Sequence, residues 1–206
     1  SSRRRMRAEV RELGVPADAH ALESEPAGTD PGEVPEVGVR QPEPEPTWQV
    51  EQGGLFYLIN LLNHPLIRQR LFADADAMAF PSGWGWLFRL GEALGLAPEP
   101  ALTHCLAGLS GLPEQHFLAQ LPALGLAPAI VAWAEQRYRG HGIAWPVVLA
   151  RTAHIEYRRP ELDVSFRMAD LEVGIRHVGL DIDPGWVDWL GTVVRFHYRG
   201  AAGWSR

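Results

Sequence analysis

The spacing of apolar and polar positions divides the chain after Trp48 into two parts. Up to about residue 140, apolar residues recur with helical spacing. The first such segment, GGLFYLINLL at 53–62, is apolar on all sides except at Asn60, which is typical of a helix inside a core. The pattern therefore predicts a helical cluster joined by short loops.

Prolines and glycines mark the ends of the remaining helices. Proline favours the first helical turn and glycine the position after the last. The predicted helices cover about residues 66–72, 82–94, 98–109, 113–121 and 128–138. In the first of them, Leu66, Ile67 and Leu71 are expected to face the core.

Beyond Gly142 the period changes to two, which indicates strands with one buried face. The alternating runs are residues 154–158, 162–168 and 193–199. Arg159-Pro160 between the first two predicts a hairpin. The apolar run WPVVLA at 145–150 is expected to form a buried strand, and LEVGIRHVGL at 171–180, which also fits a helix, is assigned to a strand.

DPGWVDWLG at 183–191 predicts a short helix. Asp183 would cap it, Pro184 would occupy its first position and Gly191 would end it in a left-handed conformation. Trp186 and Leu190 would then face the sheet. A helix of two turns is expected to leave one of its two tryptophans, Trp186 or Trp189, exposed.

Together these elements predict an α+β domain at 48–206, helical over 48–140 and β-rich over 143–200. The helical cluster would pack on a small, mostly antiparallel sheet. Residues 1–47 are predicted to be a disordered leader. Its first 14 residues carry five Arg and two Glu, and the Pro/Glu-rich linker that follows is acidic and poor in apolar residues.

Composition narrows the classes of function. All 19 basic residues are Arg, and 25 acidic residues bring the net charge to −6, which argues against a nucleic-acid partner. One cysteine excludes a disulfide framework within the chain. No apolar run reaches the roughly 18 residues that a membrane span needs.

Three histidines are weak candidates for a metal site. His154, His177 and His197 lie near Asp181 and Asp183 in the C-terminal part, and such a set could bind zinc in a metal-dependent hydrolase. However, two of the histidines fall on polar strand faces and no pair has a close ligand spacing. Exposed histidines are the simpler interpretation, so no metal or other cofactor is expected.

Other catalytic patterns are equally weak. Asp181 and Asp183 lack the further acids of a calcium loop. Cys105 adjoins His104 on a predicted helix, where neighbouring side chains diverge. These observations favour a protein that is not an enzyme. Eight tryptophans suit cores and interfaces alike, which leaves a peptide-binding module with an exposed tryptophan and a free sheet edge as an alternative.

GGLFYLINLL at 53–62 and GLDIDPGWVDWLGTVVRFHY at 179–198 together resemble the C-terminal region of proteins associated with bacterial extracellular contractile injection systems, which are phage-tail-like particles. HIEYRRPELDVSFR at 154–167 is similar to the segment that precedes this tail. The resemblance covers about residues 50–200. Its motif residues, all structural in type, are Gly53, Gly54, Phe56, Tyr57, Asp181, Asp183, Pro184, Gly185, Trp186 and Trp189.

The resemblance implies a non-enzymatic assembly or interaction role with protein partners in the particle. It also implies a bacterial cytoplasmic location during assembly, or carriage in the released particle. Some of these proteins are labelled tape-measure-like. A tape measure needs a long helical body, which this sequence lacks, so the resemblance implies an accessory protein or a terminal piece.

Overall fold

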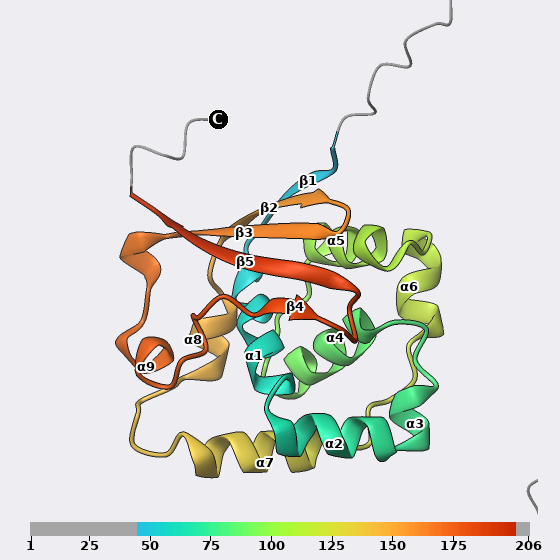
Figure 1. Ribbon diagram of the computed structural model, residues 1–206, viewed down its shortest axis with the longest axis horizontal. Helices are drawn as coiled ribbons and strands as arrows, with labels where there is room; N and C mark the ends of the chain where they lie inside the picture. The colour runs from blue at the N-terminus through green and yellow to red at the C-terminus, as the bar shows by residue number, and fades with distance from the viewer. Residues whose placement is uncertain (1–44, 201–206) are drawn as a thin grey trace, which may run out of the picture. The chain divides into compact units, whose positions relative to one another are not determined.

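A five-stranded sheet with the order β1-β2-β3-β5-β4 lies along one side of the computed structural model, which describes residues 45–200 (Figure 1). The strands are β1 (Thr47–Val50), β2 (Ala153–Arg158), β3 (Glu161–Arg167), β4 (Gly185–Val187) and β5 (Thr192–Arg199). All neighbouring pairs are antiparallel except β3 and β5, which run parallel. The predicted α+β class and mostly antiparallel sheet are confirmed.

The β2–β3 hairpin forms as its alternating pattern predicts. Ile155 pairs with Val164 across the hairpin, and both are buried. β1 was not predicted, since four residues carry too short an alternation to be recognised. It adds to β2 as an edge strand, although about a hundred residues separate the two in sequence.

The predicted leader at 1–47 lies outside the described residues except for its last three. These three already contact the sheet. Glu45 pairs with Arg158, the carbonyl of Pro46 accepts from the backbone N–H of Tyr157, and Thr47 begins β1.

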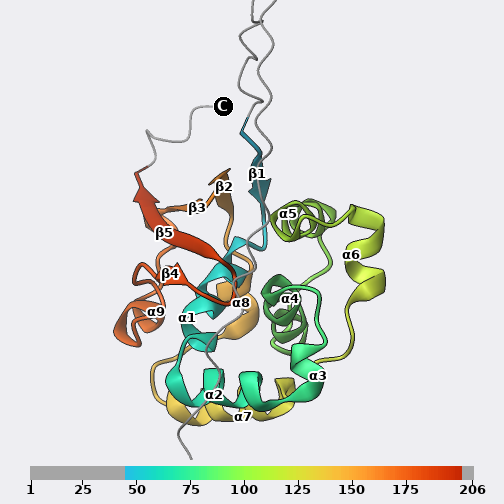
Figure 2. The ribbon, with the colours of Figure 1, turned by 45° about the vertical axis from the view of Figure 1, so that its right-hand side comes forward.

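The described helices pack on one face of the sheet. They are η1 (Gly53–Tyr57), α1 (Leu58–Leu62), α2 (Pro65–Ala73), α3 (Ala75–Met78), α4 (Gly83–Ala93), α5 (Pro100–Ser110), α6 (Glu114–Gln120), α7 (Ala127–Arg137), α8 (Trp145–Leu149), η2 (Met168–Asp170) and α9 (Val173–His177). α1 and α4 lie in the interior, and α2 and α7 lie side by side beyond them (Figures 1 and 2). Among the described residues, no helix is both long and apolar enough to cross a bilayer.

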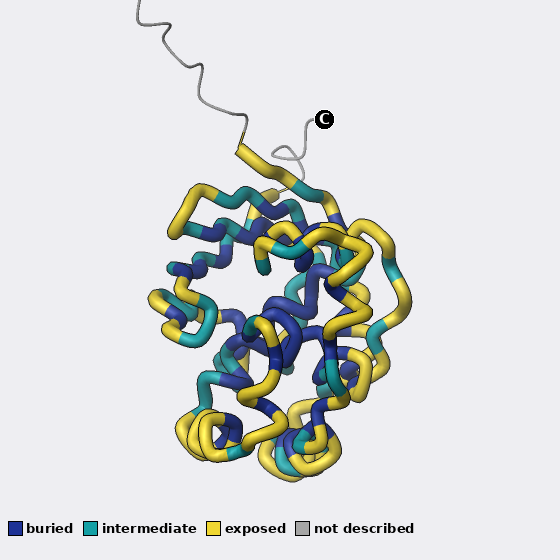
Figure 3. Tube along the Cα trace, turned by 90° about the vertical axis from the view of Figure 1, so that its right-hand side faces the viewer, coloured by how far each residue is buried: buried dark blue, intermediate teal, exposed yellow. Residues whose placement is uncertain are grey.

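The buried residues are concentrated on the segments between the sheet and the peripheral helices (Figure 3). Residues 53–62 are buried with the single exception of Asn60, as the all-round apolar pattern predicts. In α2, Ile67 and Leu71 face the core, but the expectation for Leu66 was wrong, because this side chain is 57% exposed. Adjacent helical positions point about 100° apart, so the stripe that buries Ile67 turns Leu66 outward.

Residues 145–150 form helix α8 rather than the predicted strand. The run WPVVLA has no clear period, and Pro146 stands in the first turn, where proline suits a helix. The helix presses its backbone against η1. A Cβ on Gly54 would lie 1.8 Å from the carbonyl oxygen of Val148, so only glycine permits this approach.

The assignment of residues 171–180 to a strand was also wrong. Residues Val173–His177 form α9, in which Ile175 is buried while Val173 is 69% exposed. Val173 and Ile175 would share one face of a strand, but the helix separates them and turns only Ile175 inward. Gly179, with φ of +74°, then reverses the chain toward the sheet.

The helix predicted at 183–191 is instead strand β4 followed by a turn into β5. Asp183 does not cap a helix; its carboxylate accepts a hydrogen bond of 2.7 Å from the backbone N–H of Phe196. A helix this short is unstable alone, whereas β4 gains cross-strand pairing with β5. Gly191 is left-handed as predicted, but within the turn.

Candidate interaction surfaces

The two stretches that carry the family resemblance pack against each other. Asn60 Nδ2 donates to the carbonyl oxygens of Leu180 at 2.9 Å and Ile182 at 2.7 Å. The ring of Tyr57 stacks on Phe166 at 4.5 Å and meets Phe196 edge-on at 5.5 Å. Residues 53–62 and 179–198 therefore form one packing unit in the interior.

The motif residues of the first stretch serve this packing. Gly53, Gly54, Phe56 and Tyr57 are all buried. A Cβ on Gly53 would lie 2.2 Å from the Cβ of Ala153, so the glycine lets η1 approach β2 closely. These four residues hold the helices against the sheet and offer no surface to a partner.

Most motif residues of the second stretch are also structural. The carboxylate of Asp181 accepts from Arg176 Nε at 3.2 Å, and its carbonyl accepts from the hydroxyl of Tyr198 at 3.1 Å. Pro184 and Gly185, the latter with φ of +67°, lead from the Asp183 contact into β4. Asp181 and Asp183 thus have partners within the fold.

Two tyrosines form a polar contact inside this unit. The phenols of Tyr57 and Tyr198 interact on the inner face of the sheet. Burial raises the pKa of Tyr57 far above its ordinary value, and the neighbouring phenol of Tyr198 adds to the rise. Burial raises the pKa of Tyr198 to about 12. Both phenols therefore stay neutral near neutral pH.

The two tryptophans of the second stretch differ in exposure. Trp189 is half-buried, stacks on Trp86 with 5.7 Å between ring centroids, and donates from Nε1 to Asn63 at 2.7 Å. Trp186 on β4 is 61% exposed. The prediction that one of them is exposed is confirmed, but the expectation that Trp186 faces the sheet core was wrong, because β4 turns it to the outer face.

The candidate metal-ligating histidines have separate partners. His154 Nε2 lies 3.3 Å from Glu156 and His197 Nε2 lies 2.6 Å from Asp163, both on the outer face of the sheet. His177 lies on α9, where its ring centroid is 6.4 Å from that of His141. Within residues 45–200, no group of three or more possible ligands is placed to hold a metal ion.

Cys105 lies in the core on α5. Burial raises the pKa of its thiol well above the ordinary range, and the charge of Glu99 adds to the rise. Its neighbour His104 points away, with Nδ1 2.9 Å from a carboxylate oxygen of Glu114. A buried protonated thiol is a poor nucleophile.

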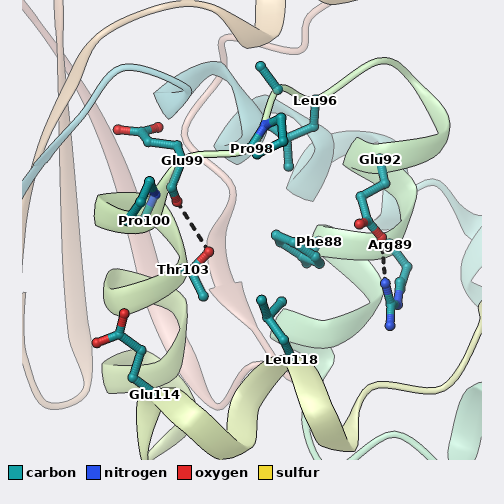
Figure 4. A pocket seen from close by; sticks show the side chains of 11 residues that line it. Phe88, Arg89, Glu92, Leu96, Pro98, Glu99, Pro100, Thr103, Glu114 and Leu118 are labelled. Carbon is teal, nitrogen blue, oxygen red and sulfur yellow. Dashed lines mark hydrogen bonds and ion pairs between the residues drawn. The ribbon is translucent and has the colours of Figure 1, made fainter.

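A groove of about 470 Å³ lies between α4, α5 and α6, in the size range of ligand sites. Figure 4 shows Phe88 at its centre, with Leu118 on one side and Leu96 and Pro98 on the other. Glu92, Glu99, Pro100, Thr103 and Glu114 stand at its margins, together with Arg89 and Ala97. Leu118 is 44% exposed, so the groove offers apolar surface to solvent.

The ionisable side chains that line the groove are engaged within the fold. Glu99 accepts from the backbone N–H groups of Glu51 at 2.6 Å and Gln52 at 2.8 Å. Glu92 pairs with Arg89 at 2.7 Å, and Arg89 also donates to two backbone carbonyls, those of Leu121 and Pro122. Glu114 pairs with His104. These groups give the groove charge, and each already has a structural partner.

Sequence reasoning did not find this groove. The sequence places Phe88 inside the helix predicted at 82–94 and Pro98 at the start of the helix predicted at 98–109, and neither position indicates a shared groove. The sequence did contain one signal for exposed apolar surface. Phe117 and Leu118 are successive large apolar residues, and a short helix cannot bury both of them on one face, so one is expected to be exposed. Comparison with family models, with curated proteins and with solved structures finds no match to this chain.

Proposed function

We propose that this α+β domain is a non-enzymatic protein-binding module that acts in the assembly of a phage-tail-like injection particle. The observation that carries the binding role is the groove between α4, α5 and α6. Its walls are apolar and partly exposed, and its ionisable groups are held in internal ion pairs and hydrogen bonds. Catalytic sites instead need titratable groups that are free to act on a substrate.

The choice of partner rests on the resemblance of residues 53–62 and 179–198 to proteins of contractile injection systems. In this proposal the two stretches build the scaffold, while the groove contacts a component of the particle. The domain then works in the bacterial cytoplasm, where such particles are assembled, and its location in the released particle is the alternative.

Copurification tests this proposal. The full chain carrying an affinity tag is expressed in its native cells, and sheath, tube and baseplate proteins that copurify with it are quantified by mass spectrometry. Leu118→Glu places a charge in the groove and is expected to reduce this recovery about tenfold or more. Leu66→Glu, at an exposed leucine on α2, is the matched control and keeps full recovery; Leu66 is 57% exposed and Leu118 44%.

Absence of tail-like components from the wild-type sample would overturn the assembly role. Equal losses with the two variants would show that a general change of surface, and not the groove, is responsible.

Trp186 favours a second candidate, a peptide-binding role at the β4 side of the sheet. Its ring is exposed beside Val193 of β5, the residue with which it pairs across the strands. An exposed aromatic residue on a short edge strand can anchor an added peptide strand. Trp186→Ala is then expected to abolish copurification while Leu118→Glu leaves it unchanged, which is the reverse of the leading proposal.

A further inference from the structure

The groove has little backbone to offer to an extended peptide. Its described lining comes from α4, α5, α6 and the connection between α4 and α5. In that connection, the N–H of Leu96 donates to Gly91 at 2.9 Å and the N–H of Ala97 to Gln52 Oε1 at 3.4 Å. Pro98 and Pro100 have no N–H. A peptide that adds as a strand would find no free ladder of donors there.

A partner segment buried in this groove must therefore satisfy its own backbone groups. An unpaired N–H or C=O in an apolar site costs as much as a lost hydrogen bond. A helix satisfies these groups within itself and presents apolar side chains along one face. Helix-in-groove binding uses such a face, with anchors at i, i+3 or i+4 and i+7.

The acidic residues at the margins of the groove favour a partner with positively charged side chains. The described lining contains three glutamates, Glu92, Glu99 and Glu114, and one arginine, Arg89, so it carries a net charge of −2. The side chains of Glu92 and Glu114 are 44% and 49% exposed, so a cation on a partner can approach their outer sides while Arg89 and His104 keep their contacts. Opposite charges at the rim favour encounter and orientation.

From these observations we infer that the groove binds an amphipathic helix of a partner protein, with apolar anchors against Phe88 and Leu118 and with Arg or Lys beside the glutamates. This inference rests on the proposed binding role and specifies its partner. The apolar face supplies the buried area, and the basic residues orient the helix.

The test uses the full chain and labelled synthetic peptides of about 16 residues, long enough to form helix. The first peptide has Leu at i, i+4 and i+7 in an alanine background with Arg at the flanking positions. A second replaces each Arg by Glu, and a third carries a central proline that breaks the helix. Fluorescence anisotropy measures the affinity of each.

The Arg peptide is expected to bind about tenfold more tightly than the Glu peptide, since two or three exposed ion pairs are gained or lost. Raising the salt concentration should narrow this difference. Leu118→Glu should weaken the Arg peptide about tenfold, whereas Leu66→Glu should not. The pair Glu92→Gln and Glu114→Gln should remove most of the preference for Arg, while Glu135→Gln on α7 preserves it.

Three results would overturn the inference without contradicting the assembly role. If the Arg and Glu peptides bind with equal affinity, the partner does not need basic residues. If the proline peptide binds as tightly as the Arg peptide, the partner does not need to be a helix. Self-association of the chain that Leu118→Glu abolishes would assign the groove to a second copy instead. The assembly role fails separately, when no particle component copurifies with the wild-type chain.

Discussion

The groove and the outer face of the sheet are both exposed and both carry paired polar side chains, but they differ in the surface that these pairs leave open. On the outer face, Arg195 forms two hydrogen bonds with Glu161 at 3.0 and 3.2 Å, and His197 pairs with Asp163 at 2.6 Å. These pairs join neighbouring strands, and the described helices lie on the other side (Figure 1). Antiparallel sheets commonly leave such a face to water.

In the groove, by contrast, the paired polar groups stand at the margins, and apolar walls that include Leu118, 44% exposed, are left to the solvent. Exposure alone therefore does not identify a surface that needs a partner. The useful criterion is whether the exposed atoms interact well with water. By this criterion the groove benefits from being covered, and on the outer face the exposed ring of Trp186 does so as well, unlike the paired polar side chains there.

The largest expected effect lies directly beneath the groove. Phe117 is fully buried on α6, and its ring meets Phe88 edge-on at 5.9 Å. Phe117→Ala should lower the free energy of unfolding by about 3–5 kcal/mol, because it leaves a cavity under the groove floor. Urea unfolding measures the change. Leu118→Ala, at the exposed neighbour, serves as the control and should cost less than about 1 kcal/mol.

A loss for Phe117→Ala no larger than that for Leu118→Ala would contradict the packing of α6 against α4. The two helices would then be packed less firmly beneath the groove than the ring contact between Phe88 and Phe117 implies.

A smaller effect on stability is expected at alkaline pH, where Tyr198 on the inner face of the sheet ionises. Below pH 10 the phenol of Tyr198 is protonated in both folded and unfolded chains, so its contribution to stability is complete. Between pH 10 and about 12 the unfolded phenol ionises first, so stability falls as pH rises through this window. Thermal unfolding across this window should show a shallower decline for Tyr198→Phe than for wild type.

Other buried groups also lower stability in alkali. Burial raises the pKa of Tyr57 and of Cys105 as well, so the wild-type curve reflects more than one group. The difference between wild type and Tyr198→Phe isolates the share of Tyr198. If the stability of the two proteins declines in parallel as the pH rises, the phenol of Tyr198 has the same pKa in the folded chain as in the unfolded chain.

The smallest effect is expected on the outer face. Glu161→Gln removes the carboxylate that holds Arg195, but both side chains are solvated and their attraction is weak. The melting temperature should fall by no more than about 2 °C, and less at high salt. If Glu161→Gln lowers the melting temperature by more than Tyr198→Phe does, this exposed ion pair contributes more to stability than its solvation predicts.

Much of the fold was predictable where a long local pattern exists. Leu162, Val164 and Phe166 alternate with polar residues, and all three are buried on one face of β3. The helices bounded by proline and glycine form within a few residues of their expected ends, with Gly95 after α4 in a left-handed conformation. Hydrophobic periodicity and helix capping depend on residues that are close in sequence, so these elements can be predicted from the local sequence alone.

The failures concern short segments whose conformation depends on distant partners. Asp183 and Pro184 suit a helix start and a turn equally well, and the pairing of Trp186 with Val193 decides between the two. Residues 145–150 carry no period at all, and their contact with η1 makes them helical. The groove escaped prediction for the same reason, because three helices from different parts of the chain converge to form it.

The position of β5 has a consequence for synthesis of the protein. Among the described strands, β5 (Thr192–Arg199) comes last in sequence, yet it lies between β3 and β4, and its Val194 and Phe196 are buried in the core. Until β5 has been synthesised, β3 lacks one of its two neighbours in the sheet and Tyr57 lacks its ring contact with Phe196. The described sheet and its core can therefore close only after nearly all of the described residues have been made.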